Sequence, residues 1–292
     1  IWPDLLAMRS PKEVVLISLC VILLCLMPVL AIHYNSTIYH VTEEEHRLAE
    51  PFAWVTIRVG VVDGDAHSSL LKSVIPNPGK VSASFFVPQP VYISLTTMAS
   101  RMHRVDRTII DLIQARILPK IIYLLVSTEP YMLDTGVTHI PDRLLCLVAS
   151  GYLQIVFTQN IGPHRKLLPA LKRHWKDDVF IATVDDDMKT DQSYMILYQL
   201  LKHHVMGGGE NKVVSLRARR IGLCSEYPHK TVRYGGWPVQ FSQNQTEMLL
   251  MPTGTGGILY RPRYFHEVIF HPVLRQVTGT ADDLMFRLAT LS

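Results

Sequence analysis

From Val91 onward, short continuous apolar runs alternate with stretches of helical spacing, and this alternation limits the possible folds more than any other feature. The apolar runs are Val91–Leu95, Lys120–Ser127, Leu153–Thr158 and Val179–Val184. The helical stretches are Val105–Ala115, Leu144–Ser150, Leu167–Trp175 and Tyr194–Val205. Alternating strands and helices predict βαβ units, and continuous apolar strands indicate a sheet that is covered on both faces. We therefore expect an α/β fold with a mainly parallel sheet and helices on both faces.

The N-terminal region contains a possible membrane anchor. Residues 14–32 form 19 consecutive positions without a charged side chain, just enough to span a hydrocarbon core. Arg9 and Lys12 precede this segment and favour a cytoplasmic N-terminus. A cleaved signal peptide is the alternative, but the segment is long for one and no clear Ala-x-Ala site follows it. We expect a cytoplasmic tail over 1–13, a transmembrane helix over 14–32 and a partly ordered stem or linker over 33–89.

Composition excludes some functions and leaves others open. The net charge of +4 and the absence of a long Lys/Arg run argue against nucleic-acid binding. Cys146 and Cys224 are able to form a disulfide in a lumenal compartment, and two buried thiols are the alternative. Sequons at Asn35 and Asn244 agree with a secretory location. Because the chain starts at Ile1 and stops after an apparently helical pattern, its sequence is compatible with a fragment that is truncated at the C-terminus.

Three consecutive aspartates, Asp185, Asp186 and Asp187, directly follow the apolar run Val179–Val184. They are expected at the carboxyl edge of the sheet, where open α/β sheets bind ligands. Carboxylates this close raise each other's pKa unless a cation neutralises them. Mg²⁺ and Mn²⁺ prefer such oxygen ligands and often bridge them to a diphosphate. A plain acidic turn after a strand remains the alternative interpretation.

Three further segments are chemically suggestive, and each has a simpler interpretation. Asp282 and Asp283 precede the helical pattern Leu284–Leu291, where they either cap a helix or supply a general base. The glycine-rich segment Thr253–Tyr260 either lets the backbone approach a ligand or makes an ordinary turn. Ile161–Lys166 follows a predicted strand and places a cation near a phosphate, or forms an exposed basic turn.

In chain order, five short motifs resemble those of GT-A fold glycosyltransferases. The motifs are Ser94-Leu95-Thr96-Thr97, Ile161-Gly162-Pro163 with Lys166, Val184-Asp185-Asp186-Asp187, Gly256-Gly257-Ile258-Leu259-Tyr260 and Ala281-Asp282-Asp283. More narrowly, they resemble a little-characterised, membrane-anchored group that is similar to family-2 glycosyltransferases. The resemblance covers Val91–Leu291, so that 90–292 would be the catalytic domain with a Rossmann-like GT-A sheet. It implies a type II, single-pass glycoprotein that faces the Golgi or ER lumen.

The resemblance also implies roles for individual residues. Asp185 and Asp187 match the two acids of the DxD motif, of which Asp187 would bind Mn²⁺ or Mg²⁺ on the donor diphosphate and Asp185 would approach the donor ribose or sugar. Asp283 or Asp282 would accept the proton of the acceptor hydroxyl. The remaining implied contacts are to the acceptor (Gly256, Gly257) and to the nucleotide and its phosphates (Thr96, Arg101, Lys166). The expected partners are a nucleotide sugar, with a UDP-sugar favoured, and a glycan or glycoconjugate acceptor.

The sequence departs from the family pattern at two places. The second strand ends in Val126-Ser127-Thr128 and lacks an acid for a uracil base, which leaves the donor nucleotide open. A late histidine ligand is also missing, because His271 is the last histidine. Inverting transfer is the expected reaction, and a catalytically silent nucleotide- or sugar-binding module with the same fold is the main alternative. A metal-dependent phosphohydrolase ranks last, because the histidines show no metal-site spacing with the aspartates.

Overall fold

The computed structural model describes residues 36–46, 52–75, 87–208, 211–225, 230–241 and 247–291. The predicted membrane anchor and the asparagines of both sequons lie outside these ranges. Within them, no helix is both long enough and apolar enough to cross a membrane. No disulfide joins the two described cysteines: Cys146 is buried in a helix and Cys224 is exposed.

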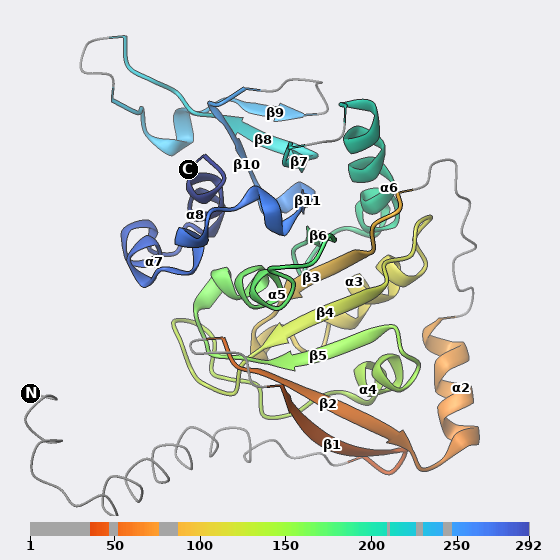
Figure 1. Ribbon diagram of the computed structural model, residues 1–292. Coiled ribbons are helices and arrows are strands. Elements are labelled where there is room, and N and C mark those ends of the chain that lie inside the picture. Colours follow the sequence, from red (N-terminus) through yellow and green to blue (C-terminus); the bar gives the residue numbers. More distant parts are fainter. Residues whose placement is uncertain are drawn as a thin grey trace, which may run out of the picture.

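The described residues form a mixed α/β fold around an eight-stranded sheet with the order β1-β2-β5-β4-β3-β6-β11-β7 (Figure 1). Its four central strands are parallel, and the strands at both edges run antiparallel to their neighbours. The strand bounds are β1 Tyr39–His46, β2 Trp54–Val61, β3 Val91–Thr96, β4 Ile121–Val126, β5 Leu153–Phe157, β6 Phe180–Thr183, β7 Val214–Ser215 and β11 Ile258–Tyr260. The predicted parallel arrangement is therefore confirmed for the centre of the sheet.

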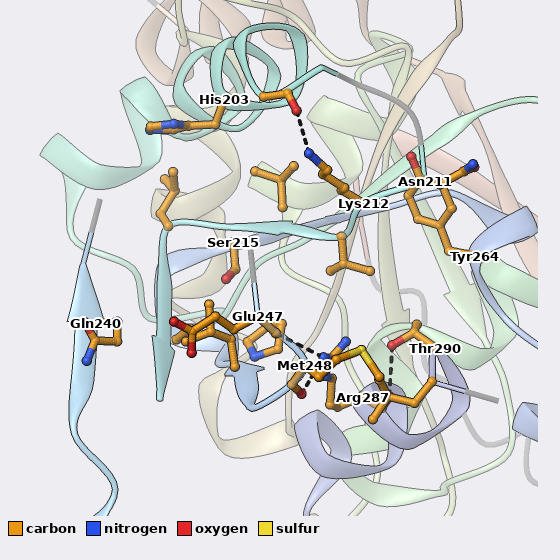
Figure 2. Close-up of a pocket in the computed structure, with 18 of the residues that line it drawn as sticks. His203, Asn211, Lys212, Ser215, Gln240, Glu247, Met248, Tyr264, Arg287 and Thr290 are labelled. Atoms are coloured by element: carbon orange, nitrogen blue, oxygen red, sulfur yellow. Dashed lines mark hydrogen bonds between the residues drawn. The ribbon is translucent and has the colours of Figure 1, made fainter. Parts of the chain in front are cut away.

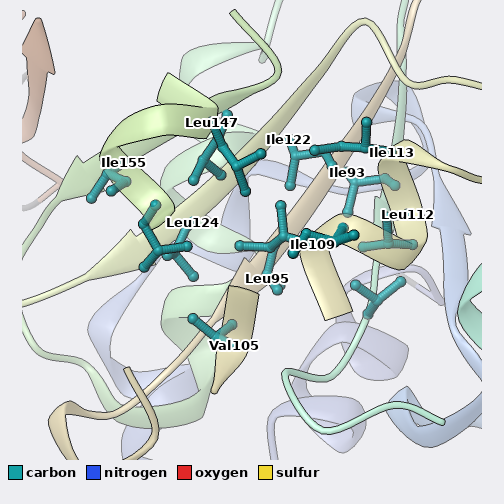
Figure 3. Packing of buried hydrophobic residues seen from close by; sticks show 14 of the residues in the cluster. Ile93, Leu95, Val105, Ile109, Leu112, Ile113, Ile122, Leu124, Leu147 and Ile155 are labelled. Carbon is teal, nitrogen blue, oxygen red and sulfur yellow. The ribbon is translucent and has the colours of Figure 1, made fainter. Parts of the chain in front are cut away.

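Helices cover both faces, as expected from the continuous apolar strands. The helices are α2 Gly64–Val74, α3 Val105–Ile113, α4 Asp142–Ala149, α5 Leu168–Arg173, α6 Thr190–Met206, α7 Pro272–Thr278 and α8 Asp282–Ala289. One face of the sheet packs against α3, α4 and α6, and Figure 3 shows the side chains that fill this interface. Residues of α5 and α8 pack on the other face.

Successive side chains of a strand point to opposite faces of the sheet, so each central strand contributes residues to both hydrophobic cores. In β3, Ile93 and Leu95 face the helices α3 and α6, whereas Tyr92 faces the opposite core. In α3, Val105, Ile109 and Leu112 are fully buried, and their spacing puts them on one stripe of the helix. Four predicted strands and four predicted helices thus match elements of the structure.

A smaller antiparallel sheet lies beyond the β11–β7 edge of the main sheet (Figure 1). Its strands are β8 Arg217–Arg220, β9 Val239–Phe241 and β10 Leu250–Pro252, in the order β10-β8-β9. β8 follows β7 after one residue, Leu216, so the chain passes directly from the main sheet into the smaller one.

The segment predicted to be a stem, 33–89, belongs to the domain where the structure describes it. β1 and β2 pair antiparallel, and β2 joins the main sheet next to β5 through Val55 and Thr56. Trp54 is fully buried, and α2 packs near α4. Asp63 caps α2 by accepting a hydrogen bond from the Ala66 amide at 2.9 Å. Within the segment predicted as a partly ordered stem or linker, β1 and β2 thus complete one edge of the sheet and α2 packs beside them.

Candidate functional site

The candidate site lies where the order of the parallel strands reverses. β4 and β6 pair with opposite sides of β3, and the segments after β3 and β6 leave the sheet from the same edge before α3 and α6 cover one of its faces. Ligands of open α/β sheets bind in the crevice that such a reversal creates. The segment after β6 begins with Val184 and the three aspartates, and the segment after β3 begins with Thr97.

Lys166 connects the two acidic groups that the sequence places about a hundred positions apart. Its ammonium nitrogen lies 3.2 Å from Asp185 Oδ1 and 3.0 Å from Asp282 Oδ2. The backbone of Lys166 is fixed as well, because the buried Ser94 hydroxyl on β3 donates to its carbonyl oxygen at 2.6 Å. Asp185, Asp282, Asp283 and Lys166 therefore form one cluster, which we call the acidic cluster.

Burial and charge act against each other in the acidic cluster. Burial opposes the charge of Lys166, but Asp282, Asp185 and Asp283 together outweigh it and raise the pKa of the ammonium. Burial also raises the pKa of Asp283 to about 6, partly offset by Lys166 and by a backbone hydrogen bond. Lys166 thus stays charged, while Asp283 titrates close to neutral pH.

Asp283 is held at one oxygen only. Its Oδ2 accepts a hydrogen bond from the Gly254 amide at 3.1 Å. Its Oδ1 is buried, and no group of the described residues donates a hydrogen bond to it. The carboxylate is therefore oriented by the backbone at one oxygen, and its second oxygen is buried with unused capacity to accept a hydrogen bond.

Gly254 was missed by the sequence analysis, which selected Gly256 and Gly257 instead. A Cβ at Gly254 would lie 2.7 Å from Lys166 Nζ and 3.1 Å from Asp185 Oδ1, so a side chain there would displace the groups of the acidic cluster. At Gly256 a Cβ would meet the Arg217 backbone and side chain, and at Gly257 it would meet Ile196 at 2.3 Å. Those two glycines pack against β8 and α6 and do not contact the acids. The sequence signal was the glycine spacing, which cannot tell which glycine faces the cluster.

The three consecutive aspartates have three different environments. Asp186 accepts from the Thr97 hydroxyl at 2.6 Å and from Arg101 Nη1 at 2.8 Å. Its side chain is 9% exposed, whereas that of Asp187 is 59% exposed and lies 3.4 Å from the same Arg101 nitrogen. Asp185 turns toward Lys166. Asp186 thus fixes the loop, and Asp187 is the aspartate that faces solvent.

The other predicted nucleotide contacts belong to a buried polar network. The Thr96 hydroxyl donates to the Leu125 carbonyl and accepts from Arg165 Nε, both at 2.8 Å. Arg165 is itself buried and forms an ion pair with Asp134 at 3.1 Å. Arg165 is therefore not the exposed basic turn that was considered as the alternative, and Thr96 and Arg165 support the loops around the acidic cluster.

Only part of the predicted metal set suits a cation in this geometry. Among the described residues, no three or more His, Cys, Asp or Glu side chains are grouped so that they could hold a metal ion. Asp185 already faces the ammonium of Lys166, which makes it a poor ligand in this arrangement. Asp187 does fit, because Mg²⁺ commonly binds one or two protein carboxylates together with substrate phosphates. The histidines do not add ligands: His174, for example, bonds to Tyr123 and Asp177.

The chain matches no protein-family model and no curated protein sequence. We therefore infer its function from the geometry of the acidic cluster and from the motifs of the sequence.

Proposed function

We propose that the chain is a GT-A fold glycosyltransferase that transfers a sugar from a nucleotide-sugar donor to an acceptor hydroxyl. The observation that supports this most is the meeting of Asp185 with Asp282 and Asp283 around Lys166 at the strand reversal. If Asp185 were part of a plain turn and Asp282 only a helix cap, their contact with the same buried ammonium of Lys166 would not be expected.

Asp283 is suited to act as the general base. In single displacement, the acceptor oxygen attacks the anomeric carbon while the bond from that carbon to the diphosphate breaks. The proton of the acceptor hydroxyl would pass to Asp283 Oδ1, which accepts no hydrogen bond from the described residues and is buried until the acceptor opens the site. A pKa of about 6 leaves the carboxylate ionised at neutral pH and basic enough to take part in proton transfer.

Asp187 is the residue that would hold a divalent cation, Mn²⁺ or Mg²⁺, together with the donor diphosphate. When bound, the cation would offset the negative charge that develops on the leaving nucleoside diphosphate. Arg101 lies beside Asp187 and is positioned by Asp186, so the segments after β3 and β6 would together present a cation and a carboxylate to the donor.

A catalytically silent binding module is a second proposal, and one contact favours it. Lys166 already neutralises the acids, so a donor or acceptor must compete with an ion pair that is formed in its absence. Such a module would bind UDP with Mn²⁺ and release no product.

The test is a screen of nucleotide sugars with Mn²⁺ that measures the released nucleoside diphosphate. We expect turnover with at least one donor, a loss of about 10²–10⁴-fold in kcat for Asp283→Asn, and loss of turnover for Asp187→Ala. Asp65→Asn, an exposed acid in α2, is the control and should leave turnover unchanged. Full turnover in folded Asp187→Ala or Asp283→Asn would refute the enzyme proposal, and UDP binding without turnover in the unmodified chain would favour the module.

A further inference from the structure

A cavity of about 780 Å³ lies apart from the acidic cluster, between the β7 edge of the main sheet and the smaller sheet. The ends of α6 and α8 close it, and none of the aspartates of the acidic cluster lines it. In Figure 2, His203 and Lys212 lie on one side, Arg287 and Met248 lie on the other, and Ser215 lies between them. Its volume falls within the range of pockets that hold small molecules.

Exposed apolar side chains from three separate segments gather at this cavity. Met206 at the end of α6 is 68% exposed, Met248 before β10 is 70% exposed, and Leu291 after α8 is 39% exposed. Single exposed apolar residues are ordinary, but a group that lines one cavity indicates a binding surface. Methionine is unbranched and adapts to ligands of different shape.

Two polar atoms in the cavity wall lack a hydrogen-bond partner among the described residues. They are the Tyr264 hydroxyl and Arg287 Nε, and both atoms are buried. Because both atoms are closed to solvent, a molecule in the cavity does not reach them and can bond to the Arg287 guanidinium only at its Nη atoms.

The charge of the cavity wall is positive. Lys212, Arg263 and Arg287 contribute cations, and Glu247 is the acid among the lining residues. Glu247 already forms an ion pair with Arg220 at 3.1 Å. The Arg287 Nη2 donates to the neutral Met248 carbonyl at 2.7 Å, and none of the described carboxylates ion-pairs with this guanidinium. Arginine stays charged even where burial lowers its pKa, so Arg287 offers an uncompensated positive charge.

We propose that this cavity binds an amphipathic anion, whose apolar body packs against Met206 and Met248 and whose anionic group bonds to the Nη atoms of Arg287. An aryl or alkyl phosphate represents this class of ligand. The proposal does not depend on glycosyl transfer, since the cavity shares no aspartate with the acidic cluster.

Phenyl phosphate is a suitable probe for the full chain reconstituted in phosphatidylcholine nanodiscs, with calorimetry and saturation-transfer NMR as readouts. Benzyl alcohol, which lacks the charge, and inorganic phosphate, which lacks the ring, are the ligand controls. We expect phenyl phosphate to bind at one site per chain, with each control ligand at least about tenfold weaker.

Two variants locate the binding site. Arg287→Gln removes the positive charge and keeps an amide donor, so it should weaken phenyl phosphate binding about tenfold. Ser215→Phe places a ring in the cavity from β7 and should abolish binding. Arg107→Gln, at an exposed arginine outside the cavity, is the matched control and should bind as the unmodified chain does.

Several results would overturn the proposal. These are the absence of phenyl phosphate binding, equal affinity for benzyl alcohol, or unchanged affinity in both folded variants. If inorganic phosphate bound as tightly as phenyl phosphate, the apolar wall would have no role and the assigned ligand class would be wrong.

Discussion

Replacement of Lys166 by methionine tests the central feature of the structure. Methionine has a similar length but no charge, so the substitution removes the ammonium from between Asp185, at 3.2 Å, and Asp282, at 3.0 Å. Three carboxylates would remain in a site where the Lys166 side chain is only 10% exposed. Removal of one partner of a buried ion pair costs about 3–5 kcal/mol, and we expect a loss of this size in the free energy of unfolding at pH 7.5.

The loss should depend on pH in a definite direction. Lys166 lowers the pKa of Asp283, so its removal lets that carboxyl group, already at about 6, titrate at still higher pH. Protonation of the carboxyl groups relieves their repulsion in the folded variant. The difference in unfolding free energy between the unmodified chain and Lys166→Met should therefore be smaller at pH 5 than at pH 7.5.

Urea denaturation of the full chain in a neutral detergent, followed by tryptophan fluorescence, measures both effects. Lys176→Met replaces an exposed lysine that follows α5 and should change stability by less than about 0.5 kcal/mol. Addition of Asp282→Asn to Lys166→Met should recover part of the loss. A loss below about 1 kcal/mol at pH 7.5, or an equal loss at both pH values, would refute a buried and charged cluster.

Three further predictions concern neighbouring residues. Gly254→Ala should destabilise the fold by about 1–3 kcal/mol in the same assay, because its methyl group would meet Lys166 Nζ at 2.7 Å, whereas Gly64→Ala, with no atom within 4 Å, should be nearly neutral. Asp186→Asn should cost about 1–3 kcal/mol and Asp187→Asn less than about 0.5 kcal/mol; equal effects would mean that the trio is a uniform acidic turn. The raised pKa of Asp283 means that the folded state binds its proton more tightly than the unfolded state, so this group's contribution to stability falls as pH rises from about 4 to about 6. Stability measured across this range should vary less in Asp283→Asn, and an unchanged profile would contradict the assignment.

The central sheet could be predicted from the sequence because each of its strands is a continuous run of mostly apolar residues. Val91–Leu95 and Val179–Val184 are apolar on both faces, which is required of strands that helices cover on both sides. The antiparallel edges carry a weaker signal. β1 contains three consecutive glutamates and β2 ends in exposed residues, so this pair resembles a linker until its register against β5 is known.

The site could be predicted only in part, because its chemistry depends on contacts between distant segments. The acids were identified from their positions after a strand and before a helix, and the structure brings Asp185, Asp282 and Asp283 together. The partner of these acids was not foreseen: Lys166 was assigned to a phosphate, and a metal ion was expected to neutralise the carboxylates. Local sequence also cannot distinguish Asp186, which fixes a loop, from Asp187, which faces solvent, since the two have nearly identical neighbours.

The pairing of β1 with β2 has a geometric consequence for any attachment to a membrane. β1 starts at Tyr39, and the predicted anchor ends at Ile32, so only six residues separate them. Six extended residues reach about 20 Å at most. If the anchor spans a bilayer as predicted, the globular part would be tethered within about one small-domain radius of the lipid headgroups. Its substrates would then have to be reachable close to the membrane surface.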